Sequence, residues 1–119
     1  AYMGTRFIAT QESLGVAAQK QMIVGASAAD IVYTPAISGV PASFLRQSLA
    51  AQGLDPDNLP SHGKLDMEGE ARAWRDFWSA GHGVGGIGDL PDVATLAGRL
   101  KAEYRAALAG AAARSAAFA

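Results

Sequence analysis

The residues best suited to chemistry stand at the start of the sequence, in Ala1-Tyr2-Met3-Gly4-Thr5-Arg6-Phe7. Tyr2 and Met3 are expected to end a short buried strand, with Gly4-Thr5 in the turn that follows it. Gly4 has no Cβ, so a ligand can approach the backbone closely there. Exposed N–H groups beside a threonine hydroxyl suit a phosphate. The alternative is an ordinary turn, which a glycine after a strand more often marks.

A second candidate is the glycine-rich run Gly81-His82-Gly83-Val84-Gly85-Gly86, which contains the spacing G-x-G-x-x-G. The dinucleotide fingerprint requires a strand before this spacing and a helix directly after it. Here an amphipathic helical pattern precedes the run, and Ile87-Gly88-Asp89-Leu90-Pro91 separates it from the next helix. The context therefore excludes a Rossmann site. We interpret the run as a flexible or closely packed loop, with room for a flat ring system or a neighbouring strand.

No other pattern of catalytic residues is evident. His62 and His82 lack the spacing of metal ligands, and no Ser-His-Asp arrangement or carboxylate pair has supporting context. The sequence contains no cysteine, which excludes disulfides and thiolate metal sites. We therefore predict no metal site.

Three motifs occur in a recognisable order. They are Met3-Gly4-Thr5-Arg6-Phe7, then Ala29-Asp30-Ile31-Val32-Tyr33-Thr34 with Gly39-Val40-Pro41-Ala42, then Trp78-Ser79-Ala80-Gly81-His82-Gly83-Val84-Gly85. Together they resemble the C-terminal part of the nitronate monooxygenase family, the 2-nitropropane dioxygenase-like flavoproteins, from Ala1 to about Leu108. That family is an FMN-binding (β/α)8 barrel with a small extra domain. The resemblance implies FMN as the cofactor.

The resemblance also implies which residues contact the cofactor. Gly4 and Thr5 would hold the FMN phosphate, in keeping with the phosphate sites of barrels after strands 7 and 8. The residues expected to bind the cofactor are Tyr2, Met3, Gly4, Thr5, Gly81 and His82. The family usually has Gln where this chain has His82, so an imidazole that titrates near neutral pH replaces an amide. Whether His82 faces the flavin or the solvent stays open.

The implied activity is the oxidation of alkyl nitronates with O2, with the flavin carrying the electron chemistry. Close relatives in the family act as NAD(P)H:quinone reductases or enoyl-acyl-carrier reductases, and this segment does not separate them. The expected partners are therefore a nitronate or quinone-like small molecule, with O2 or NAD(P)H. The family's catalytic base is a histidine upstream of this segment, so neither His62 nor His82 inherits that role.

The expected fold class is α/β, as the C-terminal portion of an FMN-binding (β/α)8 TIM barrel with a small, mainly helical extra domain. A complete barrel takes roughly 250 residues, and this chain has 119. Residues 1–7 are expected to form the last barrel strand and phosphate-binding turn, 8–73 the small subdomain, and 74–119 the return to the barrel with the flavin-side loop and a closing helix.

A different class of function is a non-catalytic fragment that serves for packing or oligomerisation, since an open barrel strand favours association. Its partners would be the N-terminal remainder of the barrel or a second copy, in a homodimer. The 119-residue segment alone is expected to be inactive.

Periodicity and capping residues predict the individual elements. Expected are a helix from the N-cap Thr10 to Gly25, a strand at Asp30–Thr34, a short helix from Pro41 to near Gly53, a loop to Leu65, and a helix over Met67–Trp78. In the last helix, Asp89 is the expected cap, Pro91 lies in the first turn, and Glu103 follows Arg99 as a minor ion pair. Its apolar stripe is Val93, Leu96, Ala97, Leu100, Tyr104 and Leu108.

The charge balance argues against a nucleic-acid partner. Ten Lys plus Arg face eleven Asp plus Glu, for a formal net charge of −1, and no basic patch is evident. No run of about 18 apolar residues and no secretory pattern is present, so no membrane partner is expected. We expect a soluble, cytoplasmic protein.

Overall fold

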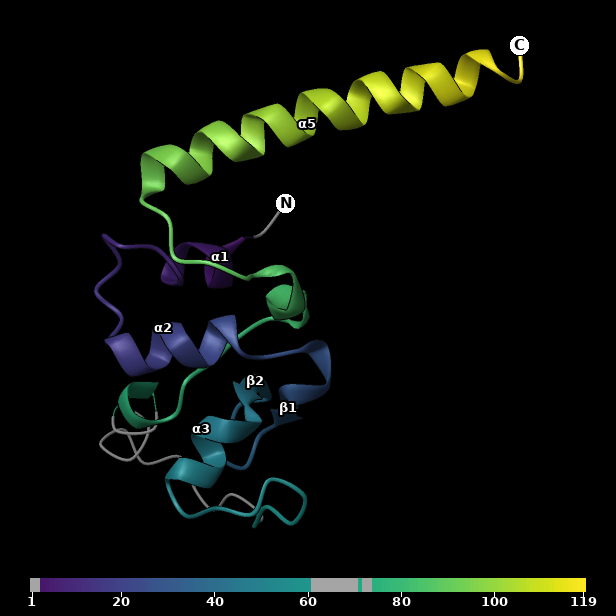
Figure 1. Ribbon diagram of the computed structural model, residues 1–119. Coiled ribbons are helices and arrows are strands. Elements are labelled where there is room, and N and C mark those ends of the chain that lie inside the picture. The colour runs from purple at the N-terminus through teal and green to yellow at the C-terminus, as the bar shows by residue number, and fades with distance from the viewer. Residues whose placement is uncertain (1–2, 61–70, 72–73) are drawn as a thin grey trace.

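The computed structural model describes residues 3–60, 71 and 74–119 (Figure 1). Tyr2, His62 and half of the predicted Met67–Trp78 helix (residues 67–70, 72 and 73) lie outside the described residues. The named elements are α1 (Gly4–Ile8), α2 (Ala17–Val24), η1 (Ala28–Asp30), β1 (Ile31–Thr34), β2 (Ala42–Leu45), α3 (Arg46–Ala51), η2 (His82–Gly86) and α5 (Val93–Ala116). The described fold thus mixes helices with one two-stranded antiparallel sheet.

Helix α1 occupies the place of the expected phosphate-binding turn. Gly4 is its first residue and Met3, its N-cap, lies in no strand, so the predictions that Met3 ends a strand and that Gly4-Thr5 forms a turn are corrected. The helix forms because the N–H of Phe7 donates to the Met3 carbonyl at 3.4 Å and that of Ala9 to the Thr5 carbonyl at 3.3 Å. The candidate phosphate donors are therefore the first residues of a helix.

Helix α2 begins seven residues later than the predicted N-cap. Thr10 does not cap it, because its hydroxyl donates to the Phe7 carbonyl at 2.7 Å and closes the chain after α1. The extended residue Val16 precedes α2 instead. The predicted end is confirmed, since the N–H of Gly25 donates to the Gln21 carbonyl at 3.0 Å.

The predicted strand at Asp30–Thr34 is confirmed over Ile31–Thr34, but its partner strand was predicted as helix. Ala42–Leu45 forms β2, which pairs antiparallel with β1 in a register that sets Ile31 opposite Leu45. Gly39 has a φ of 80°, which reverses the chain and brings β2 alongside β1. The cross-strand hydrogen bonds favour an extended backbone at Phe44 and Leu45, where the sequence pattern predicts helix. Helix α3 therefore starts only at Arg46.

The predicted end of α3 near Gly53 is confirmed, and its geometry is that of a Schellman motif. Gly53 has a φ of 81° and donates its N–H to the Ala50 carbonyl at 2.9 Å. The N–H of Leu54 donates to the Leu49 carbonyl at 3.1 Å. These two bonds satisfy carbonyls that the helix end would otherwise leave free.

The aromatic stretch predicted as the end of a helix runs beside β2 instead. Trp74–Asp76 is helical, whereas Phe77 and Trp78 follow the helix. The carbonyl of Trp78 accepts from the N–H of Leu45 at 2.9 Å, and its own N–H donates to Ser48 Oγ at 2.8 Å. This pairing with β2 and α3 draws the chain out of helical conformation.

Strand β2 separates two apolar cores. Adjacent strand residues point to opposite faces, so Phe44 and Leu45 enter different clusters. One cluster consists of Ala9, Ile23, Ala26, Leu45, Ala80, Val84 and Ile87. The other consists of Ile37, Phe44 and Leu49, and the ring of Phe44 lies 5.7 Å from that of Trp74. The first cluster supports the candidate site, because it contains residues next to α1 and in η2.

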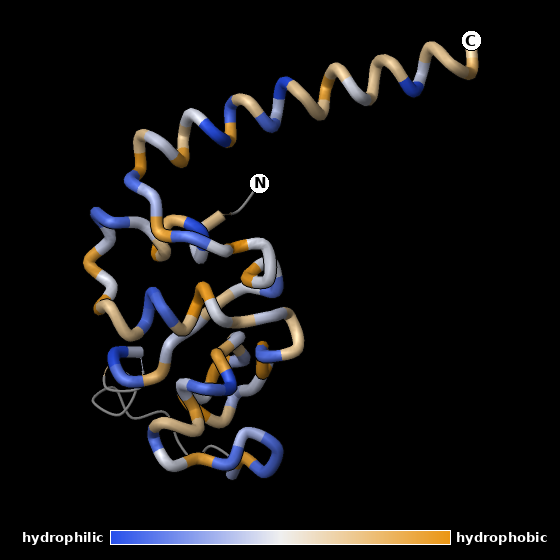
Figure 2. The backbone as a smooth tube through the Cα atoms, in the orientation of Figure 1, coloured by the Kyte–Doolittle hydropathy of each residue, from blue (hydrophilic) through white to orange (hydrophobic). Residues whose placement is uncertain are grey.

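Helix α5 extends away from the rest of the molecule (Figure 1). Its cap is Asp92 rather than the predicted Asp89, since the Asp92 carboxylate accepts from the N–H of Thr95 at 2.7 Å. Of its predicted apolar stripe only Leu96 is buried, and Tyr104 is 67% exposed. Figure 2 shows apolar residues recurring along its whole length. None of the helices in the described ranges combines the length and hydropathy that crossing a bilayer requires.

The two apolar cores predict how much stability is lost when a buried side chain of β2 is shortened. Leu45→Ala should lower the free energy of unfolding by about 2–5 kcal/mol, because it leaves a cavity where a fully buried side chain packs. Urea unfolding of the full-length protein measures this. Tyr33→Ala on the same hairpin is the matched control and should cost much less, since Tyr33 is 69% exposed. Equal losses for the two variants would contradict the assignment of Leu45 to the core.

Candidate functional site

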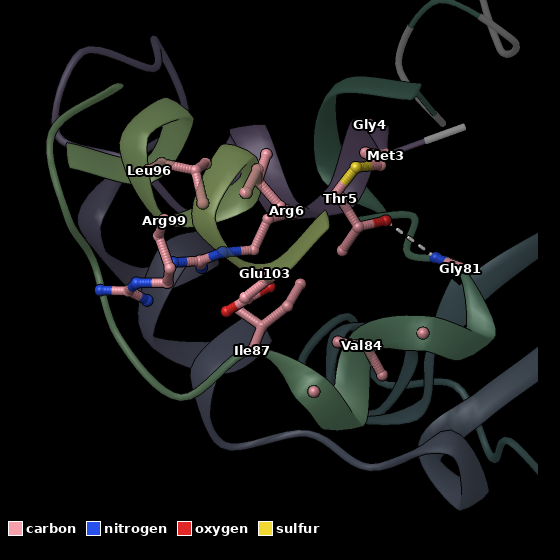
Figure 3. Close-up of a pocket in the computed structure, with 13 residues that line it drawn as sticks. Met3, Gly4, Thr5, Arg6, Gly81, Val84, Ile87, Leu96, Arg99 and Glu103 are labelled. Atoms are coloured by element: carbon pink, nitrogen blue, oxygen red, sulfur yellow. Dashed lines mark hydrogen bonds between the residues drawn. The ribbon is translucent and has the colours of Figure 1, made fainter. Parts of the chain in front are cut away.

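A pocket of about 320 Å³ lies where α1, η2 and the first turns of α5 meet (Figure 3). That size is at the lower end of the range typical for small-molecule sites. Its lining residues are Met3, Gly4, Thr5, Arg6, Gly81, Gly83, Val84, Gly86, Ile87, Leu96, Arg99, Leu100 and Glu103. The pocket therefore joins both sequence motifs that carry the predicted cofactor residues.

A single hydrogen bond links the two motifs. The backbone N–H of Gly81 donates to Thr5 Oγ1 at 2.9 Å, across 76 positions of sequence (Figure 3). A hydroxyl that accepts one hydrogen bond still has its own hydrogen to donate. No described residue accepts it, so the Thr5 hydroxyl has a donor left for a ligand.

Bare backbone forms much of the lining. A Cβ added at Gly4, Gly83 or Gly86 would meet no atom within 4 Å, so these glycines border open space rather than tight packing. In addition, the first N–H groups of a helix have no acceptor within that helix, and Gly4 and Thr5 supply such groups in α1. The site thus offers backbone donors beside space that a side chain would narrow.

The carboxylate of Asp89 joins α1 to α5 at the edge of the pocket. Arg6 donates to Asp89 Oδ1 at 2.6 Å and to its carbonyl at 3.0 Å, and Arg99 donates to Asp89 Oδ2 at 2.8 Å. The hydrogen bond from Arg99, followed by the charges of Arg99 and Arg6, holds the pKa of Asp89 below its ordinary value. Figure 3 shows both arginine side chains extending to the same side, away from Thr5 and Gly81.

Four of the six predicted cofactor residues line the pocket, namely Met3, Gly4, Thr5 and Gly81. Tyr2 lies outside the described residues. His82 begins η2 and is exposed, and it does not line the pocket, so its contact with a flavin remains a prediction. Among the described residues, no three His, Asp or Glu side chains gather as metal ligands would.

The sequence reasoning missed the residues that α5 and its preceding loop contribute. Arg99 was predicted to pair with Glu103 along the helix, but its hydrogen bonds go to Asp89, ten residues earlier. Asp89 was predicted to cap the helix. The sequence signal for this ion-pair network is the alternation of positive and negative charge in Arg6, Asp89 and Arg99. Only the folded chain shows that Arg6 lies next to the other two.

A second pocket, of about 400 Å³, lies beside α2 and the tryptophans. Its lining includes Leu14, Val16, Trp74 and Trp78. It contains none of the predicted cofactor residues. We therefore take the first pocket as the candidate site.

Neither the protein-family models nor the curated proteins yield a match to this sequence. Among solved structures, the chain superposes on a FabK mutant from Thermotoga maritima with a TM-score of 0.61. The chain shares its fold with the part of FabK that it matches. The sequences are 24% identical, and the match covers 91% of this chain but 35% of FabK. The chain thus corresponds to about a third of that structure.

The carboxylate of Asp89, which Arg6 and Arg99 share, predicts how the stability of the protein depends on pH. Because the folded pKa of Asp89 is depressed, its stabilising effect is fully present above its ordinary value of 3.8 and is lost as the pH falls through the lower folded pKa. The difference in unfolding free energy between wild type and Asp89→Asn should therefore be constant from neutral pH to about pH 4 and then vanish. Urea unfolding across this range measures it.

The control for this prediction is the double variant. In an Arg99→Gln background the Asp89→Asn change should cost less, because the principal partner is already gone. A wild-type advantage that persists unchanged in strong acid would show that the carboxylate charge does not hold α5 to α1.

Proposed function

We propose that this chain forms the phosphate-holding part of an FMN-dependent oxidoreductase that oxidises alkyl nitronates with O2. The observation that carries the proposal is the hydrogen bond from Gly81 to Thr5, which closes one pocket around the two family-like motifs. The fold shared with FabK supports the proposal at the level of architecture. Their low sequence identity lends no support to a particular activity.

The pocket residues fit the phosphate end of FMN. Gly4 and Thr5 offer backbone N–H groups at the start of α1, and the Thr5 hydroxyl offers a further donor. The open space next to Gly4, Gly83 and Gly86 admits phosphate oxygens close to the backbone. Val84, Ile87 and Leu96 give the pocket apolar sides.

Bound FMN would supply the electron transfer of the reaction. The residues of this chain bind and orient the cofactor. Thr5 would hold the phosphate in one orientation because Gly81 fixes its hydroxyl. The buried side chains of Val84 and Leu96 exclude water from their side of the pocket. The proton-accepting group of the reaction is expected in the barrel segment that precedes this chain.

Two alternatives belong to this proposal. The same site would serve an NAD(P)H:quinone reductase or an enoyl reductase of the same flavoprotein family equally well. A non-catalytic packing role is favoured by one observation: Tyr104 and Leu108 on the free part of α5 are more than half exposed. The remainder of the barrel or a second copy would cover them.

The phosphate assignment is tested by Gly4→Val. We expect the full-length variant to fold but to retain at most about a tenth of the FMN, because the branched side chain fills the space that the phosphate needs. Visible absorption of the purified protein and fluorescence titration with FMN measure this. Gly98→Val on α5, which also meets no atom within 4 Å but does not line the pocket, is the control and should retain FMN. Equal retention in both variants would refute the assignment.

The substrate is tested by separate assays on the FMN-loaded full-length protein. Oxygen consumption with an alkyl nitronate and no NAD(P)H would support the nitronate reaction. Oxidation of NAD(P)H that depends on a quinone or an enoyl thioester, without nitronate turnover, would replace it with one of the reductase alternatives.

A further inference from the structure

Glu103 is the carboxylate that the pocket leaves without a partner. It stands on α5, four residues after Arg99, and lines the pocket. Both terminal nitrogens of Arg99 donate to Asp89, at 2.8 and 3.1 Å. Among the described residues no hydrogen bond or ion pair reaches Glu103, although its charge contributes weakly, after Asp89, to raising the pKa of Arg99.

Glu103 lacks a partner in the described part of the chain because Asp89 binds the arginine with which Glu103 could pair. If Arg99 turned to Glu103, as its spacing along the helix allows, the two charges would neutralise each other. Asp89 instead binds Arg99 and Arg6 together, and Arg6 is largely buried with a side-chain exposure of 12%. The carboxylate of Glu103 therefore remains available as a hydrogen-bond acceptor.

The two sides of the pocket differ in their hydrogen-bonding character. The side near Thr5 and Gly81 presents donors, which suit a phosphate. In Figure 3 the carboxylate of Glu103 lies apart from the link between Thr5 and Gly81. An ionised carboxylate accepts hydrogen bonds and repels anions, so Glu103 suits hydroxyl groups and not the phosphate itself.

We propose that Glu103 is a specificity-determining residue that accepts hydrogen bonds from the hydroxyl groups of a phosphorylated polyol chain, such as the ribityl phosphate of FMN. This inference rests on the proposed function. The donors of Gly4 and Thr5 receive the phosphate, and Glu103 recognises the hydroxylated chain attached to it. The pocket then selects its ligand by two features. Its donors favour a negatively charged phosphate, and its carboxylate favours neutral hydroxyl groups.

The test is the binding of three flavins to Glu103→Ala, measured by fluorescence quenching on the full-length protein freed of its cofactor. Riboflavin has the hydroxylated chain without the phosphate, and lumiflavin has neither. We expect riboflavin and FMN to bind about tenfold more weakly, the loss of one hydrogen bond to a charged acceptor. Lumiflavin should bind as it does to the wild type.

Two controls accompany this test. Lys101→Ala changes an exposed residue of α5 that does not line the pocket, and it should leave all three affinities unchanged. Glu103→Gln keeps one acceptor oxygen without the charge and should fall between wild type and Glu103→Ala. Alanine and glutamine both favour helix, so α5 should persist in these variants.

Several outcomes would overturn the inference while leaving the proposed function intact. Unchanged riboflavin binding would mean that Glu103 does not meet the hydroxylated chain. Tighter binding of FMN alone would mean that Glu103 acts only by repelling the phosphate. Equal weakening of lumiflavin would mean that Glu103 supports the pocket as a whole and does not recognise the hydroxylated chain. Wild-type protein that binds none of the three flavins would instead refute the proposed function, and this inference with it.

Discussion

One carboxylate, that of Asp89, holds the walls of the pocket together. Helix α5 has few contacts with the rest of the chain, so its orientation depends on a small number of bonds near its start. Asp89 receives Arg6 from α1 and Arg99 from α5, while Glu12 accepts the first N–H of α5, from Val93, at 2.9 Å. The burial of Leu96 adds an apolar contact at the same end. Without these bonds α5 would no longer line the pocket, and the space beside Gly4 and Thr5 would be open on that side.

The same network decides how the pocket can bind an anion. Among the described residues of the lining, Arg6 and Arg99 are the cations, but both are already bound to Asp89. Together with Glu103 these four formal charges cancel. A phosphate would therefore depend on the directed N–H groups of α1 and on the Thr5 hydroxyl more than on free positive charge. Such a site favours a ligand whose phosphate is attached to a neutral, hydroxylated chain. This constraint links the proposed cofactor to the proposed role of Glu103.

The sequence was most informative where local chemistry determines structure, and least where distant contacts do. The strand at Ile31–Thr34 and the ends of α2 and α3 followed from β-branched residues and glycines, which act within a few positions. Strand β2 was missed because its conformation depends on pairing with β1. Glycine spacing identified two parts of the site, and the resemblance to a family joined them. Local spacing predicts that Arg99 and Glu103 pair along the helix, because nothing near them in the sequence reveals that Asp89, which also binds Arg6, competes for Arg99.

The role that we propose for this pocket is to hold the phosphate of FMN. The most direct measurement is the identity of the cofactor released on denaturing the purified full-length protein, separated by chromatography and quantified against the protein. We expect FMN, at about one molecule per chain, with little riboflavin because the latter lacks the phosphate. A protein that is colourless and stays so after incubation with FMN would show that the pocket does not hold this phosphate, as would one that releases only riboflavin.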